Sequence, residues 1–142
     1  MFDTMEVLAS GLSVARLRVN TIASNFANAQ TTRTEDGGPY KRRDVVQIAR
    51  PVKSHFASVL DRMTLAKPTV AAVVEDQSPP RLVYDPGHPD ANKDGYVAYP
   101  NINTVQSMTD LMSATRLYQA NLSAMNAVKR MMRDATQIAM RF

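Results

Sequence analysis

The fold is decided by residues 5–26, which read MEVLASGLSVARLRVNTIASNF. Apolar residues recur in this stretch at alternating spacings of three and four, the heptad pattern of a helix that buries a narrow seam against another helix. The seam positions are Met5, Leu8, Leu12, Ala15, Val19, Ile22 and Phe26. We therefore predict a helix over residues 3–28. Gly11 lies inside this helix, where we expect it to allow a close contact with a second helix.

The C-terminal part of the chain repeats the heptad pattern over a longer distance. Its seam positions are Leu111, Ala114, Tyr118, Asn121, Met125, Val128, Met132, Ala135, Ala139 and Phe142. Pro100 ends any preceding element, so we expect the helix to start near Asn103 or Thr104 and to extend about 50–60 Å. Asn121 is the one amide on the seam, and a single asparagine at such a position commonly fixes the register of a helix pair.

The residues between the two helices have a different character. Prolines punctuate them, and runs of β-branched residues predict strands at 44–50, 69–75 and 81–84, whereas residues 52–66 fit either a short helix or a loop. We expect residues 31–102 to form an extended module rich in β-hairpins, and residues 1–30 with 103–142 to form a terminal-helix domain. The predicted fold class is mainly α with a small β insertion, and its long terminal helices pair as an antiparallel coiled coil.

Two paired helices cannot hide all the apolar side chains that these helices carry. A pair that buries one seam on each helix leaves out a second set of large residues, namely Met108, Met112, Leu117, Leu122 and Met131. The chain also contains no tryptophan and only nine phenylalanines and tyrosines, a modest supply for a compact core. We infer that other copies or homologous chains complete the core. This pattern is typical of an assembly protein and not of a catalyst.

Composition narrows the remaining functions. The 142 residues include no cysteine, which excludes disulfides, thiolate metal sites and cysteine nucleophiles. No apolar run approaches the roughly 18 residues of a membrane span, and the first residues lack the basic and apolar regions of a secretory signal. The net charge of +4 comes from scattered Lys and Arg apart from Lys41-Arg42-Arg43, which favours a solvated surface over nucleic-acid binding. We expect a chain that stays in the cytoplasm or leaves it without a cleavable signal.

Candidate chemical sites are few. Asp90-Ala91-Asn92-Lys93-Asp94-Gly95 matches the start of a calcium-binding loop, but the twelfth position is Asn101 where a glutamate is needed, so an Asx-rich turn is the better interpretation. His55 and His88 are far apart in sequence and fit no catalytic motif, which favours surface histidines. No pair of carboxylates has a context that suggests acid–base catalysis. We therefore predict no catalytic residue, no metal site and no cofactor.

The end of the first helix is unusual because it reads SNFANAQTTRT over residues 24–34. We expect Asn28 to end the helix in the left-handed conformation that asparagine tolerates. Ser24 and Asn25 come too early for such capping. We interpret them as side chains that offer hydrogen bonds to a neighbouring chain.

These residues carry a family resemblance. SNFANAQTTRT resembles the S-N-x-A-N-x-x-T motif of bacterial flagellar rod, hook and hook-associated axial proteins. Three further segments, GGPYKRRDVV, PPRLVYDPGHPDANKDGYVAYPNINTV and MTDLMSATRLYQANLSAMNAVKRMM, narrow the resemblance to proximal-rod proteins of the FlgC type. Matched residue by residue, the axial motif maps to Ser24, Asn25, Ala27, Asn28 and Thr31. A second family motif maps to Tyr118, Gln119, Ala120 and Asn121.

The resemblance implies a structural role. Members of this family are not enzymes and have no cofactor. Their terminal helices form the inner layer of a tube, and they leave the cell unfolded through the flagellar type III export apparatus. They assemble with copies of themselves and other rod proteins on the base of the basal body, in the periplasm. The expected subunit-interface residues are Met5, Leu8, Leu12, Ala15, Val19, Ile22, Ser24, Asn25, Phe26, Asn28, Thr31, Leu111, Tyr118, Gln119, Asn121, Met125, Val128 and Met132. The alternative from the residues alone is a soluble helical adaptor that binds a partner's amphipathic helix.

Overall fold

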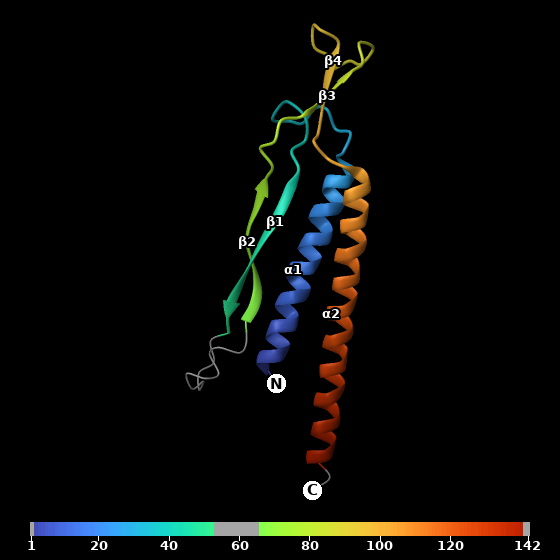
Figure 1. Cartoon of the computed structure of the whole chain (residues 1–142). Helices are drawn as coiled ribbons and strands as arrows, with labels where there is room; N and C mark the ends of the chain where they lie inside the picture. The colour runs from blue at the N-terminus through green and yellow to red at the C-terminus, as the bar shows by residue number, and fades with distance from the viewer. Residues whose placement is uncertain (1, 53–65, 141–142) are drawn as a thin grey trace.

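A computed structural model describes residues 2–52 and 66–140 of the chain. Two long helices, α1 (Phe2–Ala27) and α2 (Thr104–Ala139), lie side by side and run in opposite directions (Figure 1). Four strands lie between them in sequence and form two separate two-stranded antiparallel sheets. The strands are β1 (Arg43–Pro51), β2 (Ala66–Glu75), β3 (Arg81–Tyr84) and β4 (Tyr96–Tyr99).

The predicted fold class is confirmed in its coarse form: two long terminal helices and small antiparallel sheets. Both helices begin within a residue or two of their expected starts. Asn103 is the N-cap of α2, and its side-chain oxygen accepts hydrogen bonds from the backbone N–H groups of Val105 and Gln106. Such a cap satisfies two of the four free amides at a helix start. The strands over residues 44–50, 69–75 and 81–84 are also confirmed, whereas β4 was not predicted. Residues 53–65, on which the choice between a helix and a loop falls, lie outside the described residues.

The helix pair buries the heptad seams only where both helices are present. On α1, Ala15 is buried and the other seam positions from Met5 to Ile22 are half-buried, whereas Phe26 is exposed. On α2 the seam is buried or half-buried from Leu111 to Met132. Gly11 faces Asn121 across the pair, as expected for a helix contact, but a Cβ there would lie 3.4 Å from Nδ2 of Asn121, which is an ordinary van der Waals distance that does not require glycine.

The two helices differ in length, and this difference leaves the end of α2 without a packing partner among the described residues. Gly11 lies opposite Asn121, and because antiparallel helices rise equally per residue, the start of α1 lies near the level of about residue 130 of α2. Residues 133–140 are all exposed, Met140 by 86%. In Figure 1 this C-terminal part of α2 extends beyond the N-terminal end of α1.

The β1–β2 sheet lies along α1 on the side away from α2 (Figure 1). The pairing shifts by one residue between Val46 and Gln47, which leaves one extra residue in β2 and bends the sheet. Two polar contacts fix the sheet to the first half of α1: the hydroxyl of Ser10 donates to the carbonyl oxygen of Pro68, and Lys67 forms an ion pair with Glu6.

The β3–β4 hairpin lies at the end of the molecule where α1 ends and α2 begins (Figure 1). Val97 of β4 is fully buried, and the rings of Tyr84 and Tyr96 meet edge to face with centroids 5.4 Å apart. Gly95 precedes β4 with φ +79°, a left-handed conformation that a side chain would strain. A Cβ there would also lie 2.9 Å from Cε2 of Tyr84, so this position requires glycine.

Substitution of Gly95 tests how this hairpin is closed. We expect Gly95→Ala to weaken the β3–β4 pairing by about 2–3 kcal/mol, because backbone strain and a steric clash with Tyr84 add together. Gly37→Ala is a matched control: its φ is +83°, but no described atom lies within 4 Å of the added Cβ, so only a strain of about 1 kcal/mol is expected. The measurement is amide hydrogen exchange in β4. Equal loss of protection there in both variants would contradict the close contact with Tyr84.

Candidate assembly site

A buried amide joins the end of α1 to the start of β1. Asn25 is only 4% exposed, and its side chain contacts both backbone polar groups of Arg43. Its Nδ2 donates to the Arg43 carbonyl oxygen at 2.7 Å, and its Oδ1 accepts the Arg43 N–H at 2.9 Å. The Asn25 amide therefore occupies the place of a neighbouring strand at the first residue of β1, and it fixes where the sheet leaves the helix pair.

Two further side chains complete this polar junction. The hydroxyl of Tyr40 donates to Oδ1 of Asn25 at 3.1 Å and lies 3.4 Å from the hydroxyl of Ser24. The guanidinium of Arg43 lies 5.9 Å from the centre of the Tyr40 ring and pairs with Glu75 of β2 at 3.0 Å. The helix end, the loop before β1 and both strands of the first sheet are thereby connected through a few side chains.

This junction changes the interpretation of Ser24 and Asn25. We expected both to offer hydrogen bonds to a neighbouring chain, but three of the hydrogen bonds that the Asn25 amide can make are made within the chain. The physical reason is that the loop 28–42 folds back and carries Arg43 to the last turn of α1. Tyr40 and Arg43, which hold this junction with Asn25, were absent from the predicted site residues. No pattern near either residue indicates its distant partner.

Asn28 caps α1 in a way that differs from our expectation. No non-glycine residue among those described has a positive φ, so Asn28 does not adopt the left-handed conformation, and that prediction was wrong. Its backbone N–H and its side-chain Nδ2 both donate to the carbonyl oxygen of Ser24, at 3.0 and 2.9 Å. Its Oδ1 accepts from the hydroxyl of Thr31 at 3.2 Å. The side chain thus satisfies a terminal carbonyl without a backbone reversal.

The candidate calcium loop is an Asx-rich turn. The side-chain oxygen of Asn92 accepts hydrogen bonds from the backbone N–H groups of Asp94 and Tyr96, at 3.0 and 2.9 Å, and so closes the turn itself. Asp90 points elsewhere: its carboxylate accepts from the hydroxyl of Thr32 at 2.8 Å and lies 3.9 Å from Arg33. These contacts tie the β3–β4 loop to the loop before β1. Of the two histidines, His88 is half-buried in the same loop, and His55 lies outside the described residues.

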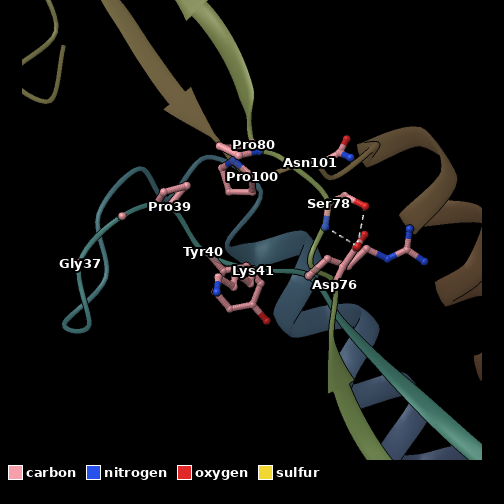
Figure 2. Close-up of a pocket in the computed structure, with 11 residues that line it drawn as sticks. Gly37, Pro39, Tyr40, Lys41, Asp76, Ser78, Pro80, Pro100 and Asn101 are labelled. Carbon is pink, nitrogen blue, oxygen red and sulfur yellow. Dashed lines mark hydrogen bonds between the residues drawn. The ribbon is translucent and has the colours of Figure 1, made fainter. Parts of the chain in front are cut away.

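A cavity of about 220 Å³ lies where the loop before β1 meets the segments after β2 and β4 (Figure 2). Pro39, Pro80 and Pro100 contribute to its lining. At its edge the hydroxyl and the backbone N–H of Ser78 donate to Asp76 (Figure 2), and these hydrogen bonds lower the pKa of the Asp76 carboxyl from its ordinary value of 3.8. The stabilisation is present above that ordinary value and is lost as the pH falls through the lower, folded-state pKa.

The side chains that line this cavity do not form a catalytic arrangement. The Asp76 carboxylate is half-exposed, and one of its oxygens, Oδ1, accepts both hydrogen bonds from Ser78. Among the described residues, no three His, Cys, Asp or Glu side chains come close enough together to hold a metal ion. The described helices also include none that is long and apolar enough to cross a membrane.

The helices carry a large apolar surface outside the seam. On α2 this surface consists of the five residues that we predicted to stay exposed, Met108, Met112, Leu117, Leu122 and Met131, and they are indeed exposed. Val105 and Ile138 extend it, at 72% and 61% exposure. Gln119 is also exposed, whereas Tyr118 and Asn121 are half-buried. Thr31, beyond the end of α1, is half-buried; its carbonyl oxygen accepts a hydrogen bond from the Tyr40 N–H at 3.1 Å, and its hydroxyl donates to Asn28.

A groove with a floor and two walls lies between α1, α2 and the β1–β2 sheet, and we refer to it as the trough. Its volume is about 310 Å³. α1 forms its floor, α2 contributes one wall and the β1–β2 sheet the other. The trough is lined by Val7, Leu8, Gly11, Val14, Ala15, Arg18, Gln47, Pro68, Leu117 and Asn121. Its floor is made largely of apolar and small side chains, and it therefore offers a shallow seat for larger apolar side chains from outside the chain.

Comparison with known proteins agrees with this architecture. The family described as "Flagella basal body rod protein" matches residues 5–33, and "Flagellar basal body rod FlgEFG protein C-terminal" matches residues 93–138. The flagellar basal-body rod protein FlgC of Borreliella burgdorferi is 39% identical, over 97% of this chain and 97% of that protein. FlgC of Bacillus subtilis is also 39% identical, over 96% and 97%, and FlgC of Salmonella typhimurium is 38% identical, over 93% and 92%.

The chain belongs to the FlgC family of flagellar basal-body rod proteins. Like other FlgC proteins it is a structural subunit of the basal-body rod and not an enzyme. The two matched segments are the ones that hold the helices: residues 5–33 contain most of α1, including Asn25, and residues 93–138 contain β4 and almost all of α2.

Replacement of Asn25 tests whether this FlgC-family motif acts within the chain. We expect Asn25→Ala to destabilise the fold by about 2–3 kcal/mol, because it leaves both polar groups of Arg43 and the hydroxyl of Tyr40 without their partner. Asn28→Ala is the matched control from the same motif and should cost about 1 kcal/mol or less, since Asn28 is only half-buried. Urea unfolding gives the free energies, and hydrogen exchange of the Arg43 amide localises the effect. Unchanged protection of that amide in Asn25→Ala would refute the assignment.

Proposed function

We propose that this chain assembles, through its terminal helices, with copies of itself and with other rod proteins into the hollow shaft that transmits torque through the flagellar basal body. The exposed apolar surface of α2 is the observation that carries this proposal. Met108, Met112 and Met131 are each more than half exposed, and the burial of one large apolar side chain contributes about 1.5–3 kcal/mol. Many such contacts, repeated around a tube, would resist shear.

The surface area of the chain supports assembly with several neighbours. The accessible surface is 10,663 Å², whereas a compact protein of 15.7 kDa is expected to expose about 7,300 Å². A standard protein–protein interface covers roughly 800 Å² on each partner. The chain therefore has a large surface for its mass, which leaves room for contacts with more than one neighbour.

We infer the following finer features of this assembly. Residues 1–30 with 103–142 form the axial domain, in which α1 and α2 pair as an antiparallel coiled coil, and residues 31–102 form the module outside it. The contact between Gly11 and Asn121 supports such a pairing, since a small residue opposite a lone seam amide fixes the register. The chain leaves the cell through the flagellar export apparatus without a cleavable signal and joins the rod in the periplasm. The seam and motif residues predicted above act at or beside its subunit interfaces.

The unpaired end of α2 gives a test of coupled folding and assembly. In the free chain, residues 133–140 have no intramolecular cover, so we expect their amides to exchange with solvent far faster than those of residues 111–128, where α1 packs against the seam. In isolated basal bodies both segments should be protected. Hydrogen exchange with mass spectrometry compares the two states. Strong protection of residues 133–140 in the monomer would contradict completion of this helix by neighbouring subunits.

Removal of the gene tests the function directly. We expect a deletion strain to be non-motile and to contain basal-body rings without a completed rod, because later axial subunits lack the surface on which they assemble. Electron microscopy of purified basal bodies is the measurement, and expression of the full chain from a plasmid, which should restore rods and swimming, is the control. Normal rods in the deletion strain would overturn the proposal.

A further inference from the structure

We propose that the exposed ridge on α2 of one copy packs into the trough of the next copy. The ridge consists of Val105, Met108, Met112, Gln119 and Leu122, which are all exposed. This inference rests on the proposed assembly of the chain, and it specifies which face of one subunit meets which face of its neighbour.

The two surfaces lie on opposite sides of the same helix. Side chains on an α-helix are separated by about 100° per residue, which places the ridge about 180° from the α2 wall of the trough, formed by Leu117 and Asn121. A subunit can therefore present its ridge to one neighbour and its trough to another. Such a head-to-tail contact uses two different surfaces and does not close into a dimer, so it continues from subunit to subunit around a shaft.

The shapes of the two surfaces suit each other. The floor of the trough contains Gly11, which has no side chain, between the apolar residues Val7 and Val14. Met108 and Met112 of the ridge have long unbranched side chains, which fill irregular apolar spaces well. The ridge spans residues 105–122 and the trough meets α2 at residues 117–121, so the surfaces lie at overlapping levels. Copies that stand side by side in the same orientation can therefore bring them together.

A second copy of this chain is the occupant that the surface area favours. The chain exposes roughly 3,000 Å² more than a compact protein of its mass, and a ridge and a trough on one chain provide both halves of a repeating contact. Apolar packing of this kind also requires no charged partner. Among the residues that line the trough, Arg18 is the one with a charged side chain, and the five ridge residues are uncharged, with the exposed Arg116 one helical turn from Met112 on the same face.

Two amides are placed to fix the register of this contact. Asn121 lines the otherwise apolar α2 wall of the trough, and Gln119 lies between Met112 and Leu122 on the ridge. Neither side chain forms a hydrogen bond with another described residue. Because the two residues point to nearly opposite sides of α2, they cannot meet within one chain. We therefore assign Gln119 of one copy as the hydrogen-bond partner of Asn121 in the next.

Disulfide cross-linking in cells tests the face pairing, and the absence of native cysteine makes the background clean. Met112→Cys places a thiol on the ridge, and Leu117→Cys places one in the trough wall. The double variant should form a ladder of dimers, trimers and larger species when motile cells are treated with a mild oxidant. Each single variant should stay monomeric. Met112→Cys with Ser123→Cys, where both positions lie away from the trough, is the matched control and should also give no ladder.

The outcomes separate this inference from the proposed function. Motile cells of the double variant without a ladder would overturn the ridge-and-trough contact but leave assembly into a rod intact. Dimers from Leu117→Cys alone would also overturn it, because they require two troughs to face each other. Normal rods in a deletion strain would contradict the proposed function itself.

Replacement of the two amides by residues of opposite charge tests their pairing independently of the cysteine variants. Gln119→Lys and Asn121→Asp should each reduce the amount of the chain in isolated basal bodies by about tenfold, since each puts an unpaired charge into the contact. The double variant should recover most of that loss, because the lysine of one copy then pairs with the aspartate of the next. Circular dichroism of the purified variants controls for folding. A double variant as defective as the worse single variant would refute the pairing of Gln119 with Asn121.

Discussion

The whole structure depends on the packing of a short helix against a longer one. α1 can cover one seam of α2 and no more, and it covers that seam only as far as Met132. Gly11 faces Asn121 across the pair, and this contact sets its register. Once this register is fixed, the exposed positions on α2 follow from helix geometry alone, including the ridge and the free C-terminal turns. The apolar ridge left for assembly therefore follows from the single seam that α1 covers, whereas the exposed C-terminal turns follow from the unequal helix lengths.

The second constraint is the Asn25 junction, which makes the sheet and the helix pair one mechanical unit. An asparagine side chain carries the same donor and acceptor as a peptide group, and here it satisfies the first residue of β1 in place of a neighbouring strand. A buried amide with its partners in place is directional, whereas apolar packing is not. The junction thus defines where the β1–β2 sheet lies along α1, and with it the second wall of the trough. The buried polar contacts of Asn25 thus help to shape the apolar trough on the surface of the subunit.

The sequence predicted what depends on periodicity and local chemistry. The spacing of apolar residues predicts both helices, three strands and the exposed apolar residues of α2 from Met108 to Met131. The preference of Asn and Asp for turns predicts the Asn92 turn. Two departures from the expectations come from contacts between residues distant in sequence, and a third comes from a local side-chain cap. β4 is a short YVAY segment that forms a strand because β3 pairs with it, and Asn25 acts within the chain because Arg43 returns to it. Asn28 avoids the left-handed conformation because its own side chain caps the helix.

These two constraints together explain why the subunit suits a shaft. In the proposed contact, a ridge on one side of α2 and a trough on the other would give the chain a direction around an axis, and such head-to-tail contacts form rings or open helices and not closed dimers. Because the seam lies inside each subunit, shear between subunits would act first on the proposed ridge-and-trough contact. The apolar ridge can stay exposed to water while the chain is monomeric. A few half-exposed apolar side chains cost much less free energy than exposure of a whole hydrophobic core. Stability of the subunit and cohesion of the shaft therefore reside in different faces of the same helix.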